Sequence, residues 1–401
     1  MKKVIVIGAG ILGASASYQL SKLGAEVTII DRKDAGQATD AAAGIICPWL
    51  SQRRNKAWYR LAKAGASFYP SLIEELEASG EVHTGYAKVG AICLHHDLQK
   101  LEKMKERAEL RREEAPEIGE LTMLTEAEAR ERFPLLSEGY YALHVSGAAR
   151  VDGRELRDAL LRAAQRNGAK LINGDAAIEH DQHNITGVRV GEQLLTADEI
   201  IVCAGAWANT LLHPIGIMSE VRYQKGQIMH LQYEDVQHGD VQHQDLHQQR
   251  LHHAFLHHKS QTNTDQWPVV MPPTDQYLLS FADGRIVIGA THENDVAGYN
   301  TSVTAGGMQE MLNKGLQAAS GLADCSLTEI RVGFRPFTAD FLPVLGRVAG
   351  WNKLIVANGL GSSGLTMGPF LGEQLAKLAM NQQVDIPLED YVVERAIKTS
   401  S

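Results

Sequence analysis

Residues 4–31 read Val4-Ile5-Val6-Ile7, then Gly8-Ala9-Gly10-Ile11-Leu12-Gly13, and they close with Val27-Thr28-Ile29-Ile30-Asp31. The order predicts a strand, a glycine turn, a helix and a second strand that ends in an acid. An isolated GxGxxG is a weak signal, but here it follows an apolar run and opens a helix. The acid lies about 20 residues further on, as the dinucleotide-binding fingerprint requires.

Each residue type in this stretch has a physical task. Gly8 permits the tight turn, Gly10 lets the backbone approach a pyrophosphate, and Gly13 lets the helix pack close to the sheet. The helix N-terminus presents N–H groups and a positive dipole end to the phosphates. Asp31 is placed to accept hydrogen bonds from a ribose.

The start of the chain also has features of a signal peptide, because Lys2 and Lys3 precede an apolar run. Three glycines in register, two serines and Gln19 interrupt that run, and a second strand follows where a cleavage site would stand. No other stretch approaches the roughly 18 continuous apolar residues of a membrane span. We therefore expect a soluble, cytoplasmic protein.

Length and composition limit the remaining possibilities. A chain of 401 residues favours two domains, and a net charge of −9 argues against a general nucleic-acid surface. The cysteines are scattered and form neither a CxxC nor a metal-ligand spacing, so we expect reduced thiols at Cys47, Cys93, Cys203 and Cys325.

Three further segments are rich in small residues. Residues 34–46 would let a planar ligand lie against the backbone. Residues 199–207 predict a buried strand that ends in the turn Ala204-Gly205, and residues 354–369 again predict a strand, a glycine-rich turn and a helix start. Ligands of open α/β sheets bind beyond the carboxyl ends of such strands. The cofactor domain is therefore expected to combine segments from both ends of the chain.

Other elements follow from periodicity. Residues 97–114 predict a solvated amphipathic helix, with Leu98, Leu101, Met104 and Leu110 on one face and no binding role. A second helix is predicted over 153–167, and strands over 170–172 and 185–190. An Asp-Gly turn between apolar runs predicts a hairpin over 277–291, hence an antiparallel sheet.

Residues 230–258 contain eight of the sixteen histidines. The pairs His243 with His247 and His253 with His257 have the i,i+4 spacing that can bind a metal. No zinc-protease pattern accompanies them, and long polar surface loops are readily tolerated. We expect a solvated insertion and no functional metal site.

The whole chain resembles the D-amino-acid oxidase superfamily of FAD-dependent oxidoreductases, closest to its glycine oxidase, sarcosine oxidase and D-amino-acid dehydrogenase branch. Four features carry the resemblance: GAGILG with Asp31, the AAAG at 41–44, the Gly-Phe-Arg-Pro run at 333–346, and the terminal glycine-rich turn. It implies an α/β plus α+β fold, with a Rossmann-like FAD-binding domain interleaved with an antiparallel-sheet substrate domain. The expected domain boundaries are 1–80, 140–220 and 330–401 for the former, and 81–139 and 221–329 for the latter.

The resemblance implies bound FAD. It places residues at the phosphates (Ile11, Leu12), the adenosine ribose (Asp31, Arg32), the pyrophosphate and flavin (Ala38, Thr39, Ala43, Gly44, Ile45), the adenine (Ala177) and the flavin's polar edge (Leu360, Gly361, Ser362, Ser363, Gly364, Leu365, Thr366). The glycines of the first turn (Gly8, Gly10, Gly13) and the residues of the second turn (Ala204, Gly205) are expected to face the same cofactor because of their places at strand ends. The cysteine that tethers flavin in sarcosine oxidases has no counterpart in 337–341, so FAD is expected to bind non-covalently.

For the substrate, Arg335 matches the family's carboxylate-binding arginine, since a planar guanidinium grips a carboxylate with two hydrogen bonds. Tyr277 falls where glycine oxidases place an active-site tyrosine, although a strand tyrosine in the core is an alternative. His292 lies near the flavin in relatives, where it would bind substrate or fill space. Ser362 stands where glycine oxidases carry a second arginine, which puts glycine itself in doubt as the substrate.

The expected reaction is oxidation of a small amino acid of the D-amino acid, glycine or N-alkyl glycine type. A hydride passes from the α-carbon to flavin N5, and the imine product hydrolyses to a keto acid. Two alternatives stay open. One is oxidation of a 2-hydroxy acid, with His292 as the base, and the other is a flavin-bound subunit that needs a partner. The sequence leaves open the exact substrate, the oligomeric state, and whether oxygen or a quinone-type carrier accepts the electrons.

Overall fold

The opening strand, turn and helix form as the sequence predicts. A computed structural model describes residues 1–234, 263–294 and 296–399. In it β1 (Lys3–Ile7), α1 (Ile11–Lys22) and β2 (Glu26–Asp31) follow one another, and β1 and β2 pair in parallel. Gly24 follows α1 with a φ of +79°, the left-handed conformation of a helix C-terminal cap.

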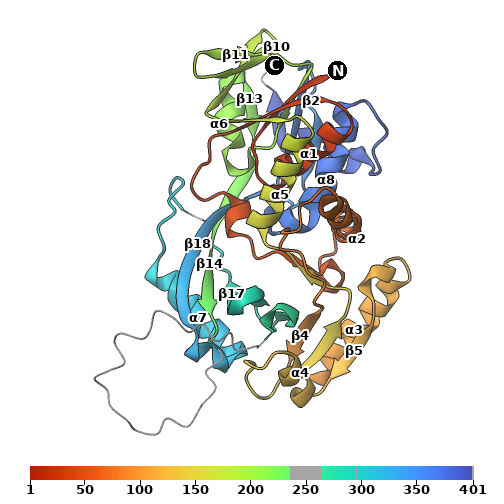
Figure 1. Cartoon of the computed structure of the whole chain (residues 1–401), viewed down its shortest axis with the longest axis vertical. Coiled ribbons are helices and arrows are strands. Elements are labelled where there is room, and N and C mark those ends of the chain that lie inside the picture. The colour runs from red at the N-terminus through yellow and green to blue at the C-terminus, as the bar shows by residue number, and fades with distance from the viewer. Residues whose placement is uncertain (235–262, 295, 400–401) are drawn as a thin grey trace.

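A six-stranded sheet forms the upper part of the molecule in the order β19-β20-β12-β1-β2-β8 (Figure 1). Its other strands are β8 (Lys170–Asn173), β12 (Glu199–Val202), β19 (Val344–Arg347) and β20 (Leu354–Asn358). All neighbours pair in parallel except β19 and β20. The carboxyl ends of β20, β12, β1, β2 and β8 therefore meet at one edge of the sheet.

Both faces of this sheet are covered. Val4 and Val6 of β1 pack in the cluster that contains the apolar residues of α1, α5 (Gly153–Arg166) and α8 (Gly364–Ala379). Ile5 and Ile7 point the other way, into a cluster with the three-stranded sheet of β9 (Ala176–Asp181), β10 (Asn184–Val190) and β11 (Gln193–Leu195). Burial on both faces explains why β1 is a continuous apolar run without alternation.

An eight-stranded sheet forms the lower part, in the order β18-β14-β17-β16-β15-β4-β6-β5 (Figure 1). Its strands are β4 (Ala91–His95), β5 (Leu121–Leu124), β6 (Tyr141–Val145), β14 (Arg222–Gln232), β15 (Val269–Met271), β16 (Tyr277–Ser280), β17 (Arg285–Gly289) and β18 (Ser326–Phe337). The hairpin predicted over 277–291 is β16 and β17. The sheet is antiparallel except where β15 pairs in parallel with β4.

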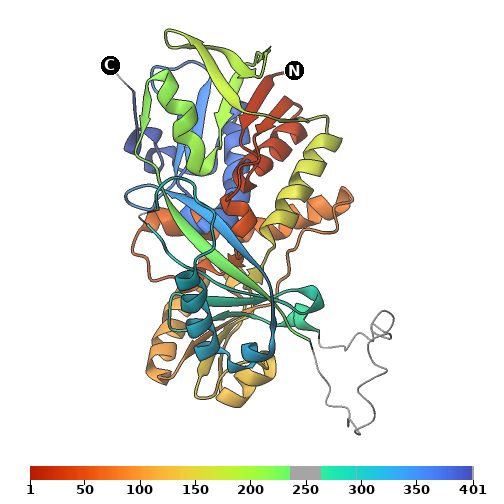
Figure 2. The same cartoon turned by 90° about the vertical axis from the view of Figure 1, so that its left-hand side faces the viewer.

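Two long strands connect the two parts of the molecule. Figure 2 shows β14 and β18 running side by side from the eight-stranded sheet toward the six-stranded one. The remaining named helices and strands are β3 (Ile45–Ile46), α2 (Lys56–Ala78), α4 (Glu126–Arg132), β7 (Ala149–Arg150), α6 (Ala208–Leu212), β13 (Ile217–Ser219), α7 (Ala305–Ala318) and β21 (Ile397–Thr399).

The charged helix α3 (Leu98–Arg112) forms where predicted, but its apolar face differs from the expected one. Leu101 is buried, whereas Leu98 is 41% and Leu110 is 68% exposed. The helix packs on β4, β5 and β6. Leu101 and Met104, in the middle of the predicted stripe, are the residues that pack against the core.

The division into two domains stays a proposal. Strand pairing would move its boundary from residue 140 to a point after Val145, because β6 (Tyr141–Val145) belongs to the eight-stranded sheet. Most of the histidine-rich stretch, including His243, His247, His253 and His257, lies outside the described residues. Its expected role as an insertion without a metal stays a prediction too.

Two further properties concern the described residues. None of their helices is long and apolar enough to cross a membrane. All four cysteines are free thiols. Burial raises the pKa of Cys93 and of Cys203 to about 12, so both remain protonated.

Candidate functional site

A long cavity opens at the edge of the six-stranded sheet where the carboxyl ends of its parallel strands meet. Of the expected cofactor residues, those that line it are Gly8, Gly10, Ile11, Leu12, Asp31, Arg32, Ala38, Thr39, Ala43, Gly44, Ile45, Ala204, Gly205, Leu360, Gly361, Ser362, Gly364, Leu365 and Thr366. Arg335, Tyr277 and His292 line the same cavity. Segments from the beginning, middle and end of the chain therefore share one site.

Three expected residues lie outside the cavity lining. Gly13 supports the turn instead: a Cβ at this position would lie 1.8 Å from the carbonyl oxygen of Gly8. Ala177 is exposed, and its neighbour Ala176 takes the place at the wall, because successive side chains of a strand point to opposite faces. Ser363 is buried and lines an adjoining cavity.

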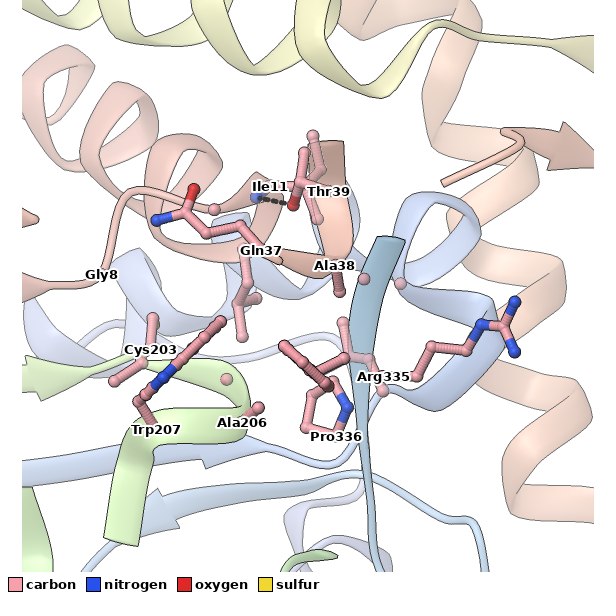
Figure 3. A pocket seen from close by; sticks show the side chains of 18 of the residues that line it. Gly8, Ile11, Gln37, Ala38, Thr39, Cys203, Ala206, Trp207, Arg335 and Pro336 are labelled. Carbon is pink, nitrogen blue, oxygen red and sulfur yellow. Dashed lines mark hydrogen bonds between the residues drawn. The ribbon is translucent and has the colours of Figure 1, made fainter. Parts of the chain in front are cut away.

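Polar contacts hold the glycine turn in place before any ligand enters. The Ile11 N–H donates to Thr39 Oγ1 over 3.0 Å (Figure 3), and the Ala9 N–H donates to Asp31 Oδ2 over 2.6 Å. Asp31 Oδ1 also accepts from Lys33 N and Gln37 Nε2. Asp31 as a whole is 8% exposed, and its carboxylate keeps acceptor capacity for a further hydroxyl.

Hydrogen bonds between distant segments hold the cavity wall together at two places. Thr366 Oγ1 donates to the carbonyl of Ile45 over 3.1 Å, which ties the start of α8 to the small-residue segment. Asn358 Nδ2, at the end of β20, donates to the carbonyl of Gly205 over 2.9 Å. These bonds bring together three of the four small-residue segments identified in the sequence.

Arg335 supplies a positive charge at the end of the cavity that lies away from Cys203 and Trp207 (Figure 3). Its Nη1 donates to Gln224 Oε1 over 3.2 Å and to the Thr291 carbonyl over 3.1 Å. Within the described chain it forms no salt bridge with a carboxylate. Because both Nη1 contacts are to neutral acceptors, the charge stays uncompensated and available to an anionic ligand.

A glycine makes room for this guanidinium. A Cβ on Gly226 of β14 would lie 2.4 Å from Arg335 Nη2. Gly226 pairs with Gly333 across the two long strands, and both residues line the cavity. The Arg335 side chain therefore lies across the bare backbone of the neighbouring strand, which restricts where its guanidinium can be.

Tyr277 and His292 flank the arginine. Burial raises the pKa of Tyr277, and the nearby Arg335 partly offsets that shift, so the hydroxyl stays protonated and can donate a hydrogen bond. Burial lowers the pKa of His292, and Arg335 lowers it further by charge repulsion. His292 Nδ1 lies 3.7 Å from Asp275 Oδ2, but its side chain is 42% exposed. At neutral pH it is therefore an uncharged imidazole at the cavity wall.

Some wall residues lie in predicted segments but were given no role of their own. Gln37 and Phe334 belong to residues 34–46 and 333–346, and their individual roles depend on contacts between β18 and the loop after β2. Trp207 could have been assigned a place at the wall, since it lies two residues after the turn Ala204-Gly205. It stacks on Tyr299 with ring centroids 5.0 Å apart and lines the cavity far from Arg335 (Figure 3).

The chemistry of this lining fits a dinucleotide cofactor. The wall near α1 combines a helix N-terminus, a buried acid and residues with little or no side chain, which suit phosphates, a ribose and a close planar ring in turn. Arg32, which is held by Asp34 at 2.7 Å and Asp175 at 3.0 Å, adds a cation at the cavity edge. None of these features requires a metal.

Comparison with known proteins gives a consistent result. The model of one family, FAD dependent oxidoreductase, matches residues 3–378. The chain is 53% identical over 391 residues to the uncharacterized oxidoreductase YurR of Bacillus subtilis, covering 98% of each chain. It is 25% identical over 374 residues to a glycine oxidase of Pseudomonas putida, covering 92% of each. Among solved structures, an iminodiacetate oxidase from Chelativorans sp. BNC1 has a TM-score of 0.88 at 42% identity, covering 97% of this chain and 98% of that one.

Proposed function

Because the chain belongs to the family of FAD-dependent oxidoreductases, we propose that it oxidises an N-substituted glycine, a secondary amine whose α-carbon carries a carboxylate. The observation that carries this proposal is Arg335, a guanidinium with no acidic partner in the described chain, in the cavity that we assign to FAD. The likeness to an iminodiacetate oxidase supports the substrate class, since iminodiacetate is glycine with a second carboxymethyl group on nitrogen.

Recognition of the substrate begins with its carboxylate. Arg335 can use the N–H groups on Nε and Nη2, because Nη1 is already engaged by Gln224 and Thr291. Tyr277, whose raised pKa keeps it protonated, is close enough to Arg335 to donate to the same carboxylate or to the amine. Together they would fix the α-carbon in one orientation, and positioning of this kind lowers a barrier by itself.

The protein needs no strong base for amine oxidation. When bound, FAD accepts the hydride from the α-carbon. The amine enters deprotonated, and the uncharged His292 adds no positive charge that would oppose oxidation of the amine. The imine product then leaves the cavity and hydrolyses to a 2-oxo acid and an amine.

We assign the cofactor contacts to the residues that line the cavity, with the phosphates at the N-terminus of α1 and the ribose at Asp31. FAD is proposed to bind non-covalently, and Ala176 replaces Ala177 as the residue nearest the adenine. The cytoplasmic location and the acceptor, oxygen or a quinone-type carrier, are likewise proposals.

Arg335→Leu tests the substrate assignment, with Arg331→Leu as a matched control. Arg331 lies four residues earlier on β18 and pairs with Glu329, outside the cavity lining. We expect Arg335→Leu to lower kcat/KM for sarcosine and iminodiacetate by about a thousandfold, as for a lost bidentate charged contact, while FAD content stays normal. Anaerobic bleaching of the flavin absorbance gives the rate. Unchanged amine oxidation by Arg335→Leu would exclude the proposed carboxylate contact.

One observation favours a second candidate function. Oxidation of a 2-hydroxy acid would use the same arginine but needs a base at the hydroxyl, and the neutral imidazole of His292 lines the cavity. Bleaching by 2-hydroxyglutarate, with none by secondary amines, would favour this function over the proposed one.

A further inference from the structure

A second cavity adjoins the one assigned to FAD. The two cavities share Ile45, Ser362 and Thr366 in their walls. The second cavity extends from there between the end of β15 and helix α3, the helix at the lower right of Figure 1. Ser362 is the exposed residue among these three, and its small side chain is part of the wall of both cavities.

Three cations of α3 line the second cavity. They are Lys100, Lys103 and Arg107, spaced three and four residues apart, so they lie on one face of the helix. No aspartate or glutamate of the described chain lines this cavity, and none forms a salt bridge with these three side chains. By contrast, Lys105 on another face pairs with Glu109 over 3.8 Å.

Arg107 is the most enclosed of the three. Its Nε is shielded from solvent and has no hydrogen-bond partner within the described chain, whereas Lys100 and Lys103 are exposed at the mouth. The cavity wall also contains the side-chain oxygens of Ser51 and Gln52, but neither accepts a hydrogen bond from this Nε. A shielded charged donor without an acceptor is costly unless a ligand supplies one.

We propose that this cavity binds a second anionic group of the substrate, a carboxylate carried on the nitrogen substituent. The inference rests on the proposed function, because Arg335 must hold the first carboxylate for the substituent to reach toward α3. The substrate class narrows accordingly to dicarboxylic secondary amines. Lys100 and Lys103 raise the local concentration of such dianions, and Arg107 binds the distal carboxylate.

Binding of sulfur analogues to the FAD-loaded protein, measured by calorimetry, tests the cavity without turnover. Thiodiacetate and 3-(carboxymethylthio)propanoate carry two carboxylates at two spacings, and (methylthio)acetate carries one. We expect at least one dianion to bind about tenfold or more tightly than the monoanion, and the preference to fall as salt rises. Arg107→Gln should abolish the preference and leave the Kd of (methylthio)acetate unchanged.

Two further variants, Lys103→Gln and Lys105→Gln, test whether the lysines that face the cavity contribute to binding of the dianion. Lys103 is exposed, so its loss should weaken dianion binding by a few-fold without disturbing the fold, and the ion-paired Lys105 should have no effect. The inference is overturned if neither dianion is preferred, or if Arg107→Gln weakens the monoanion equally. Should sarcosine be oxidised in the absence of any dianion preference, only this inference fails. Should the preference hold but no amine bleach the flavin, the proposed reaction fails and the anion-binding cavity remains.

Discussion

The two sheets contribute different kinds of groups to the site. At the edge of the six-stranded sheet the wall is backbone and small side chains, held by short contacts such as that of Ala9 N with Asp31. The eight-stranded sheet contributes long side chains, with Arg335, Tyr277 and His292 taken from β18, β16 and the segment after β17. The first kind of site leaves no room for a Cβ at positions such as Gly8 and Gly44, whereas the second depends on where a few flexible groups are held.

The largest effect should come from Gly13→Ala. The added Cβ would lie 1.8 Å from the Gly8 carbonyl oxygen, so α1 must move away from the turn. We expect a loss of about 3 kcal/mol or more in the free energy of unfolding and little bound FAD. Gly306→Ala in α7 is the control, because a Cβ there meets nothing within 4 Å, and it should raise stability slightly. Thermal unfolding measures the stability of each variant, and the flavin-to-protein absorbance ratio measures its FAD content. If Gly13→Ala and Gly306→Ala behave alike, the close packing at Gly13 does not have the expected importance.

Gly226→Ala would show whether the side-chain part of the site is equally intolerant. Its Cβ would displace the Arg335 guanidinium, which lies 2.4 Å from that position, and leave the glycine turn of α1 untouched. We expect kcat/KM for iminodiacetate to fall roughly 10- to 100-fold, with normal FAD content. In the Arg335→Leu background the same substitution should cost nothing further, because the group that it displaces is gone. If the losses of Gly226→Ala and Arg335→Leu add up in the double variant, Gly226→Ala does not act by displacing Arg335.

The smallest effect is expected for His292→Asn. The lowered pKa of His292 makes the imidazole neutral at pH 7.5, so the substitution removes no charge, and kcat/KM for amines should change less than about threefold. Because its pKa is lowered, the wild-type imidazole gains a proton only at a pH below the usual range of histidine, and this adds positive charge beside Arg335. That charge should strengthen binding of the substrate carboxylate and lower the KM of the wild type alone, so the ratio of the variant's KM to the wild type's should rise. A loss of about a hundredfold at pH 7.5 would instead identify His292 as a base and favour 2-hydroxy acid oxidation.

The sequence could predict those elements whose signals are local. The β1–α1–β2 unit, the hairpin of β16 and β17, and the helices at 98–112 and 153–166 all form where their patterns placed them. It erred on the apolar face of α3, because periodicity alone does not say how much of a helix its neighbours cover. It also could not assign individual roles to Gln37 or Gly226, which meet residues of the distant strand β18.

By itself, the sequence determined the backbone-built half of this protein's site. Glycine spacing, an acid at a strand end and runs of small residues act within one turn and its neighbouring strands, so their meaning is local and can be read in order. Only the tertiary structure decided how Arg335 lies over Gly226, and how Lys100, Lys103 and Arg107 come to line a cavity beside the one that we assign to FAD. The reason is physical. The charged group of a long side chain lies far from its own backbone, so its position depends on the register of remote strands and on the packing of helices.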